Sequence, residues 1–150
     1  MLIPKGLYNK IKKTIPIPCI DLVVFNGAGH ILMLKRENEP ARGQWWFPGG
    51  RVLHGEKREQ AVRRKLKEEC GLTGIIKREI GTFDVILNYR LTNNEVIRSH
   101  AISTFYYVTD IRKSEIVLDS QSSKFKWCSK PECLKLTTDK ALKKILEKVL

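Results

Sequence analysis

The feature that most constrains the fold is a sharp break in the chain followed directly by a helix. The run Phe47-Pro48-Gly49-Gly50 interrupts any regular structure, because proline lacks a backbone donor and glycine favours turns. In the charged segment 56–69 that follows, three apolar side chains fall on one side of a helix: Ala61, Val62 and Leu66. Gly71 stands where a left-handed C-cap is expected, and Leu72 follows as its apolar partner. The sequence therefore predicts a loop-helix corner near the middle of the chain.

Strand-like segments lie on both sides of this corner. Before it, the apolar runs 19–25 and 31–34 are separated by the turn signal Asn26-Gly27-Ala28-Gly29, a pattern that predicts a β-hairpin. After it come further runs rich in β-branched and aromatic residues: 75–80, 83–91, 101–108 and 125–128. The chain closes with an amphipathic helix predicted over 140–150, for which Asp139 is the expected N-cap.

The order of these elements bounds the fold class. Strands and helices follow one another as β-β-α-β-β-β-β-α, which is neither the alternation of a parallel sheet nor a helical bundle. We expect an α/β (α+β) fold in which a mixed sheet is flanked by helices. The chain has 150 residues without an internal repeat or a linker, so residues 1–150 are expected to form a single domain.

Composition narrows the range of partners. Lys and Arg number 28 against 16 Asp and Glu, which gives a formal net charge of +12 and a surface that attracts phosphates. The apolar runs fall far short of the roughly 20 residues that span a bilayer, and the start of the chain has no secretory signal pattern. The four cysteines show neither zinc-ligand spacing nor a disulfide framework: Cys19, Cys70, Cys128 and Cys133. These features predict a cytoplasmic protein without a membrane partner.

Groups suited to phosphate chemistry gather at the loop-helix corner. Gly49-Gly50-Arg51 lies one short loop before a helix that carries four charged side chains: Glu56, Arg64, Glu68 and Glu69. Backbone carbonyl and carboxylate oxygens are ligands that Mg²⁺ prefers, and a guanidinium offers paired donors to phosphate. On the helix alone, a solvated face with two ion pairs, Arg64–Glu68 and Lys65–Glu69, explains the same residues.

The complete spacing favours the chemical interpretation. The residues read Gly50-x5-Glu56-x7-Arg64-x-Leu66-x-Glu68-Glu69-x-Gly71-Leu72, which resembles the Nudix box at eight of its nine fixed positions. Lys65 stands at the ninth, where the Nudix box has Glu. The resemblance implies the Nudix fold, an α/β/α sandwich with a central mixed β-sheet. It also implies hydrolysis of a small-molecule nucleotide substrate, a nucleoside diphosphate linked to another group, with Mg²⁺ or Mn²⁺ as cofactor.

Flanking residues are most similar to one branch of that family, the GDP-mannose mannosyl hydrolases, over residues 19 to about 127. The similar residues include Asp21, Lys35-Arg36, Arg42-Gly43-Gln44-Trp45, Arg51-Val52, His100 and Gln121. The resemblance implies metal ligation by the carbonyl of Gly49, by Glu69 and by Gln121.

The same resemblance implies the substrate contacts. Arg36 and Arg51 would bind the diphosphate and stabilise the charge that builds on the leaving group. Asp21 and His100 would be further contacts of the substrate. In that branch the N-terminal segment, here 1–13, exchanges across a homodimer and touches the partner's substrate. The corresponding contacts in this chain are Leu2, Ile3 and Tyr8.

Two departures from that branch leave the mechanism open. The branch has a His general base directly after its metal-binding Gln, and this chain has Ser122, whose hydroxyl cannot hold a proton taken from water near neutral pH. Lys65 either contacts a phosphate or replaces a second metal ion, or it forms a salt bridge with Glu69 or points outward into solvent. Glu68, which the branch lacks, is the expected general base and a further metal ligand. Arg36, Arg51 and Glu68 are thus the expected catalytic residues.

Three functions remain open on these residues. The first is Mg²⁺-dependent hydrolysis of a nucleoside diphosphate sugar to GDP and sugar. The second is attack on phosphorus, by a pyrophosphatase of nucleotide sugars or nucleoside triphosphates. The third is a catalytically weakened Nudix domain that binds nucleotide or RNA through its basic surface. No RNA-binding signature is present, so nucleic acid is not an expected partner.

Overall fold

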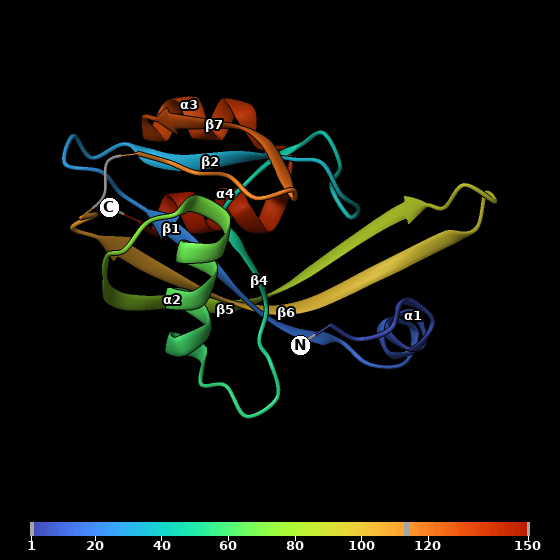
Figure 1. Ribbon diagram of the computed structural model, residues 1–150. Helices are drawn as coiled ribbons and strands as arrows, with labels where there is room; N and C mark the ends of the chain where they lie inside the picture. The colour runs from blue at the N-terminus through green and yellow to red at the C-terminus, as the bar shows by residue number, and fades with distance from the viewer. Residues whose placement is uncertain (1, 113–114, 150) are drawn as a thin grey trace.

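The chain folds into strands enclosed by helices. The computed structural model describes residues 2–112 and 115–149 (Figure 1). The strands are β1 (Ile17–Val24), β2 (Ile31–Arg36), β3 (Trp45–Trp46), β4 (Gly49–Arg51), β5 (Ile75–Arg90), β6 (Val96–Thr109) and β7 (Ser122–Cys128). The helices are α1 (Lys5–Thr14), α2 (Arg58–Cys70), α3 (Lys130–Leu136) and α4 (Lys140–Lys148). Within those two ranges, no helix is long and apolar enough to cross a membrane.

The strands form two sheets. The first has the order β4-β1-β6-β5 and the second the order β3-β2-β7. In the first sheet β1 runs parallel to β6, whereas the β1–β4 and β5–β6 pairs are antiparallel. This sheet is therefore mixed, as predicted, and the second sheet is antiparallel.

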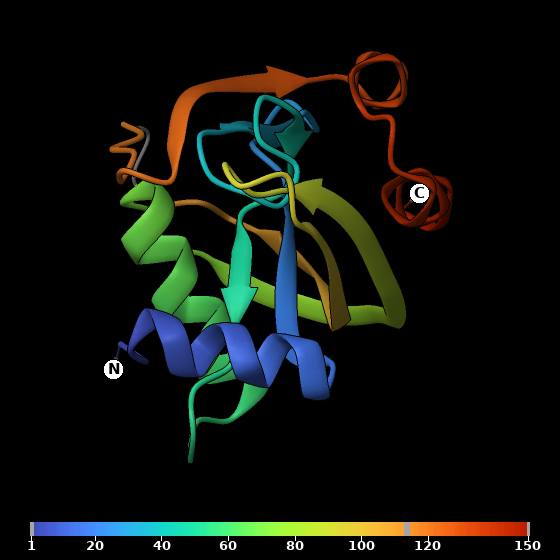
Figure 2. The same cartoon turned by 90° about the vertical axis from the view of Figure 1, so that its right-hand side faces the viewer.

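Helices cover the strands on two opposite sides. Figure 2 shows α2 on one side of the strands, with α3 and α4 on the other. Successive residues of a strand point to opposite faces, so β1 and β2 contribute to two cores. The core on the α2 side includes Ile20, Leu22, Leu32 and Leu34. The core on the α4 side includes Val23, Ile31 and Met33. This arrangement is the predicted α/β/α sandwich.

The predicted hairpin of residues 19–25 and 31–34 is wrong. β1 and β2 belong to different sheets and meet at one isolated bridge, between Phe25 and Ile31. β1 has β4 on one edge and β6 on the other, so neither edge is open to β2 along its length. The turn signal therefore predicts where the chain reverses, but not which strands pair.

The expected break at 47–50 is also partly wrong, because Gly49–Arg51 forms β4. This short strand pairs with β1 and sets Gly49 opposite Asp21, so long-range pairing overrides the local preference of glycine for turns. The predicted strands 75–80 and 83–91 are one continuous strand, β5. Its pairing with β6 shifts at two irregularities, and a strand that shifts register there can bend without ending.

The predicted helices are confirmed with small changes at their ends. α2 spans Arg58–Cys70 instead of 56–69, and Gly71 caps it in the left-handed conformation with φ of 68°. Asp139 caps α4 as predicted, because its carboxylate accepts from two amides of the first turn. Leu150, the predicted last residue of this helix, lies outside the described residues.

Two further helices escape the sequence analysis. α3 begins at a capping box in which Ser129 accepts from the Glu132 amide and the Glu132 carboxylate accepts from the Ser129 amide. The Ser-x-x-Glu spacing is a readable signal of such a start. α1 buries none of its residues completely, and none of them belongs to either of the two cores.

Candidate active site

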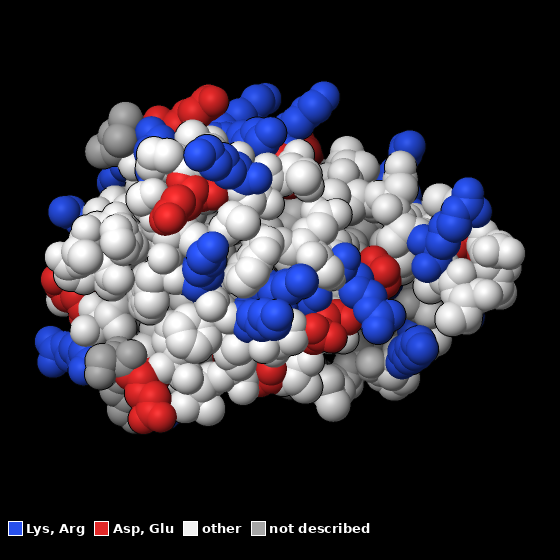
Figure 3. Space-filling model, turned by 90° about the horizontal axis from the view of Figure 1, so that it is seen from above, with Lys and Arg blue, Asp and Glu red and all other residues white. Residues whose placement is uncertain are grey.

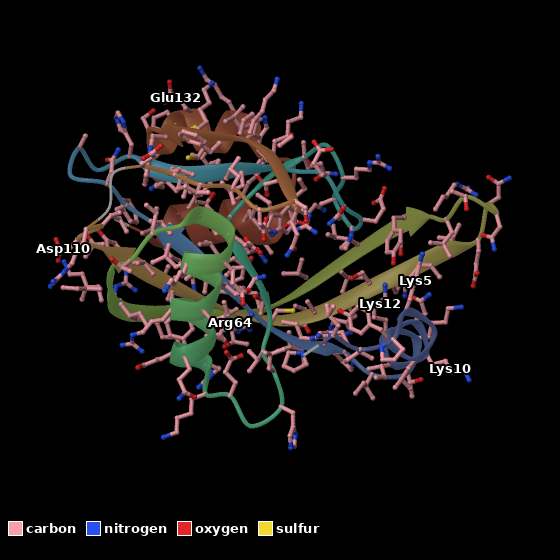
Figure 4. The ribbon with its side chains drawn as sticks, in the orientation of Figure 1. Lys5, Lys10, Lys12, Arg64, Asp110 and Glu132 are labelled. Atoms are coloured by element: carbon pink, nitrogen blue, oxygen red, sulfur yellow. The ribbon has the colours of Figure 1, made fainter. Side chains whose placement is uncertain are left out.

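Arg64 ties α2 to the loop that precedes it. Its guanidinium donates to both carboxylate oxygens of Glu56, at 2.7 and 3.0 Å, and to the carbonyl oxygen of Arg51 at 3.0 Å. Glu56 also accepts from the amide of Leu53 at 2.9 Å, and its hydrogen bonds with Arg64 hold the pKa of Glu56 below the usual value. Figure 4 shows Arg64 on the side of α2 near β4. This network fixes the end of β4 against the helix.

The next residue of α2, Lys65, forms a buried ion pair with Glu69 one turn later. The Lys65 ammonium is 2.9 Å from Glu69 Oε1 and 3.7 Å from Glu68 Oε2. The other oxygen of Glu69 accepts from the Gly49 amide at 3.1 Å. Lys65 and Glu69 are only 6% and 4% exposed. Burial raises the pKa of Glu69, and the neighbouring ammonium opposes that rise. The predicted salt bridge between Lys65 and Glu69 is therefore present.

Asp21 is a buried carboxyl next to β4. It stands opposite Gly49 in the β1–β4 pair and accepts a hydrogen bond from the Ser103 hydroxyl. Burial raises the pKa of Asp21 to about 7, although the Ser103 hydrogen bond opposes the rise. A carboxyl with this pKa changes its protonation state near neutral pH. Ser103 escapes the sequence analysis, because a single Ser in a strand gives no signal before β6 is known to pair with β1.

A cavity of about 550 Å³ opens beside these groups. The predicted site residues that line it are Tyr8, Asp21, Arg36, Gly49, Arg51, Glu68 and Gln121. Several other residues of the lining are not predicted from the sequence, among them Val85, Leu87 and Ser99. Lys65 is also part of the lining, whereas Glu69 is not among the described residues that form it. Residues from distant parts of the chain thus meet around one concave site.

Two arginines of the cavity wall have defined neighbours. The guanidinium carbon of Arg51 lies 4.9 Å from the centre of the Tyr8 ring, within the range of a cation–π contact. Arg36 Nε donates to the carbonyl oxygen of Pro40 at 2.8 Å. Both guanidiniums lie on the wall of the cavity, where a planar, permanently charged group is suited to phosphate oxygens.

The helix α1 lines the cavity of its own chain. Lys12 Nζ donates to the Tyr89 hydroxyl at 2.9 Å and so ties α1 to β5, and Figure 4 shows Lys12 between α1 and the β5–β6 hairpin. Leu2 and Ile3 line the same cavity as Tyr8. The sequence interpretation puts the segment 1–13 across a homodimer, but within one chain these residues already reach the site. Met1 lies outside the described residues.

His100 is set apart from the other predicted site residues. Its neighbours on β6, Ser99 and Ala101, line the cavity, and successive side chains of a strand point to opposite faces. The His100 imidazole instead lies 2.8 Å from the Asp84 carboxylate. The expected contact between His100 and a substrate in this cavity is therefore not supported by the fold.

The predicted metal ligands carry oxygen donors that suit Mg²⁺, but the Lys65 ammonium lies next to one of them, Glu69. Glu68 and Gln121 bring oxygen donors to the cavity wall beside Gly49, and such donors suit a hard cation. Glu69 already accepts from Lys65 and from the Gly49 amide. Within the described ranges, no group of three His, Cys, Asp or Glu residues is arranged to hold a metal ion. Oxygen donors that suit Mg²⁺ are therefore present, but they include one carboxylate fewer than the Nudix box has, because Lys65 stands in place of a Glu.

Asp21 is expected to make stability depend on pH. Between its ordinary pKa of 3.8 and the value of about 7 in the fold, the folded protein keeps a proton that the unfolded chain has lost. The free energy of unfolding should therefore fall as pH rises through this window, by up to about 1.4 kcal/mol per pH unit from this group. Urea unfolding at pH 4.5 to 8 measures the slope. Asp21→Asn should flatten it, and an equal slope in both proteins would contradict the prediction.

The chain matches a known family over most of its length. The NUDIX domain matches residues 16–149. The chain is 35% identical over 125 residues to the low-salt glycan biosynthesis protein Agl8 of Haloferax volcanii, which covers 83% of this chain and 78% of Agl8. It is 45% identical over 53 residues to an ADP-ribose pyrophosphatase of Methanocaldococcus jannaschii, which covers 35% of this chain but only 31% of that protein.

Solved structures share the fold. The MutT protein of Methanosarcina mazei superposes with a TM-score of 0.71 at 23% identity, covering 90% of this chain and 94% of that protein. The NUDIX domain of NrtR from Shewanella oneidensis, complexed with ADP ribose, gives a TM-score of 0.69 at 19% identity, covering 97% of this chain and 96% of that chain. The similarity in fold therefore extends over most of the chain.

Proposed function

Because this chain belongs to the Nudix family and is a Nudix hydrolase, we propose that it hydrolyses nucleoside diphosphate sugars with Mg²⁺, releasing GDP and sugar. Nudix proteins act on small-molecule nucleotide substrates. The observation that carries the proposal is the cavity of about 550 Å³, which has Arg36, Arg51 and the α2 carboxylate of Glu68 on its walls. A volume of this size is typical of a small-molecule site, and the arginines match a diphosphate.

Residues of the cavity have two roles in this proposal, substrate binding and proton transfer. Arg36 and Arg51 bind the diphosphate oxygens through paired N–H donors. Glu68, half-exposed at the cavity, takes the proton from the attacking water. Glu68, Glu69, Gln121 and the Gly49 carbonyl are the candidates to hold Mg²⁺. When bound, such an ion neutralises a diphosphate as it becomes a leaving group.

The preference for a sugar nucleotide has support outside the box. The flanking residues resemble the GDP-mannose mannosyl hydrolases, and four of the residues that carry this resemblance line the cavity: Asp21, Arg36, Arg51 and Gln121. The relative from Haloferax volcanii is named for glycan biosynthesis, a process in which sugars are handled as activated donors. Guanine and mannose are therefore the first base and sugar to test.

Attack on phosphorus is the second candidate. Ser122 pairs with Arg36 across β7 and β2, at the position where the mannosyl hydrolase branch has its His base. A water activated by Glu68 could reach a phosphorus atom in place of the sugar carbon. The relative from Methanocaldococcus jannaschii is named as a pyrophosphatase of ADP-ribose, which supports this candidate.

A binding role without turnover is a weaker candidate. Figure 3 shows Lys and Arg side chains scattered over one face of the molecule, with acidic side chains among them. Proteins that follow a nucleic-acid backbone gather their basic residues in a stripe or patch. The family match and the hydrolase-named relatives support an enzyme, so we propose turnover.

Product analysis in ¹⁸O water tests the proposal. We expect the purified protein with Mg²⁺ to convert GDP-mannose to GDP and mannose, with the label in mannose, because water attacks the sugar carbon. Label in GMP or mannose 1-phosphate would contradict carbon attack and support the phosphorus candidate. ADP-ribose, dGTP and 5′-triphosphorylated RNA serve as comparison substrates, and a sample with chelator in place of Mg²⁺ is the control.

A further inference from the structure

A buried ammonium lies on the wall of the cavity. Lys65 is 6% exposed, and taking a charged amine out of water costs several kcal/mol unless partners replace the lost hydration. Glu69 supplies one partner at 2.9 Å, and Glu68 is 3.7 Å away. The ion pair explains why the charge is tolerated. It does not explain why a cation, rather than an apolar side chain, stands at the edge of a substrate-sized cavity.

The neighbouring strand makes room for this side chain. A Cβ atom added to Gly50 would lie 2.7 Å from Lys65 Cε and 3.2 Å from Nζ. The ammonium is therefore packed against the backbone of β4, next to Arg51. Gly50, Arg51 and Lys65 all line the cavity, so its wall carries positive groups from two different elements, β4 and α2.

The ammonium has donors left for a ligand. It carries three N–H groups, of which Glu69 accepts one, while Glu68 lies beyond hydrogen-bond distance at 3.7 Å. In the parts of the chain that the structure describes, Lys65 has no other ion-pair partner. A phosphate oxygen in the cavity is the acceptor that best matches a lysine held between carboxylates, since charge-assisted hydrogen bonds are the strong ones.

We propose that Lys65 is a resident cation of the site, which binds a diphosphate oxygen directly and supplies part of the positive charge that other members of the family take from metal ions. The proposal rests on the proposed function, because it assumes that a diphosphate occupies this cavity. It makes the site less dependent on metal for binding. The chain should hold a diphosphate even when divalent ions are removed.

Calorimetry with inorganic pyrophosphate in metal-free buffer containing EDTA tests this inference. The wild-type protein should bind pyrophosphate, and Lys65→Met should weaken binding by about tenfold or more, the usual loss for a charge-assisted hydrogen bond. Lys67→Met is the matched control, because Lys67 is exposed on the same helix; its affinity should equal that of the wild type. Equal affinity in Lys65→Met, or no binding by the wild type, would overturn the inference.

A second variant tests whether weak pyrophosphate binding by Lys65→Met comes from misfolding. Lys65→Met leaves the Glu69 carboxylate buried without its partner, so the double variant Lys65→Met/Glu69→Gln replaces the pair by uncharged groups of similar size. Its circular dichroism should match that of the wild type, and its pyrophosphate affinity should be as weak as that of Lys65→Met. Restored affinity in the folded double variant would overturn the inference. These measurements involve no turnover, so a failure of the proposed function, seen as no hydrolysis of sugar nucleotides, is separately recognisable.

Discussion

Gly49→Ala is expected to destabilise the protein strongly. A Cβ atom at this position would lie 2.4 Å from the carbonyl oxygen of Ile20, 2.6 Å from Asp21 Oδ1 and 2.9 Å from Asp21 Cα. Two of these atoms belong to the backbone of β1, a central strand paired on both edges, so they cannot move aside as a flexible side chain would. We expect the free energy of unfolding to fall by at least about 3 kcal/mol, at the upper end of the cost of overpacking.

Urea unfolding followed by circular dichroism measures this loss. Gly27→Ala is the matched control, because a Cβ atom there would meet nothing within 4 Å; its stability should stay within about 0.5 kcal/mol of the wild type. A Gly49→Ala protein as stable as the wild type would mean that β4 does not pair with β1 in the observed register.

Glu69→Gln is expected to damage both stability and activity. The substitution keeps an acceptor for the Gly49 amide but leaves the Lys65 ammonium without its neutralising partner at 2.9 Å. Breaking a buried pair in this way costs about 3 kcal/mol or more. Because Glu69 is also a proposed metal ligand and orients Lys65, turnover should fall by about 10²-fold or more, comparable to the loss of a group that stabilises the transition state.

Thermal unfolding and turnover with Mg²⁺ measure the two effects. Glu59→Gln is the control, since Glu59 lies on the same helix in an exposed ion pair with Arg63 at 3.9 Å, and such pairs contribute little. The control should match the wild type in both measurements. A Glu69→Gln protein with wild-type stability and turnover would show that this carboxylate neither holds Lys65 nor takes part in the reaction.

The sequence predicts the parts of the fold that depend on local order. The apolar face and the Gly71 cap of α2 follow from residues within one segment, and the structure confirms them, with the helix start displaced by two residues to Arg58. Pairing between distant strands is different. The apolar runs 19–25 and 31–34 look like a hairpin, yet β1 pairs with β4 and β6, because a strand buried on both faces pairs with whichever strands the whole chain brings to its edges.

The candidate site likewise contains residues that the sequence predicts and residues that it does not. Residues tied to the box or to its flanks, such as Arg36, Arg51 and Asp21, meet at one cavity. Ser103 and the hairpin residues of the wall do not stand out, because nothing in their local sequence marks them before β5 and β6 are placed. His100 is a different case: a resemblance in sequence predicts a substrate contact, whereas in the structure its imidazole lies beside Asp84 and its neighbours on β6 line the cavity.

The sequence and the structure give different information about Lys65. The sequence identifies it as a cation where the Nudix box has Glu, and leaves open a phosphate contact or a salt bridge. The structure contains the salt bridge, at 2.9 Å, on the wall of the cavity. A buried ion pair is weak support for stability by itself, which is why its function in binding is worth measuring.

The most direct test of the account is the product analysis of GDP-mannose with the purified wild-type protein and Mg²⁺. The account predicts Mg²⁺-dependent release of GDP and mannose, with ¹⁸O from water in the mannose and faster turnover than for ADP-ribose, dGTP or 5′-triphosphorylated RNA. Intact GDP-mannose in a sample that hydrolyses one of the other three substrates would contradict it.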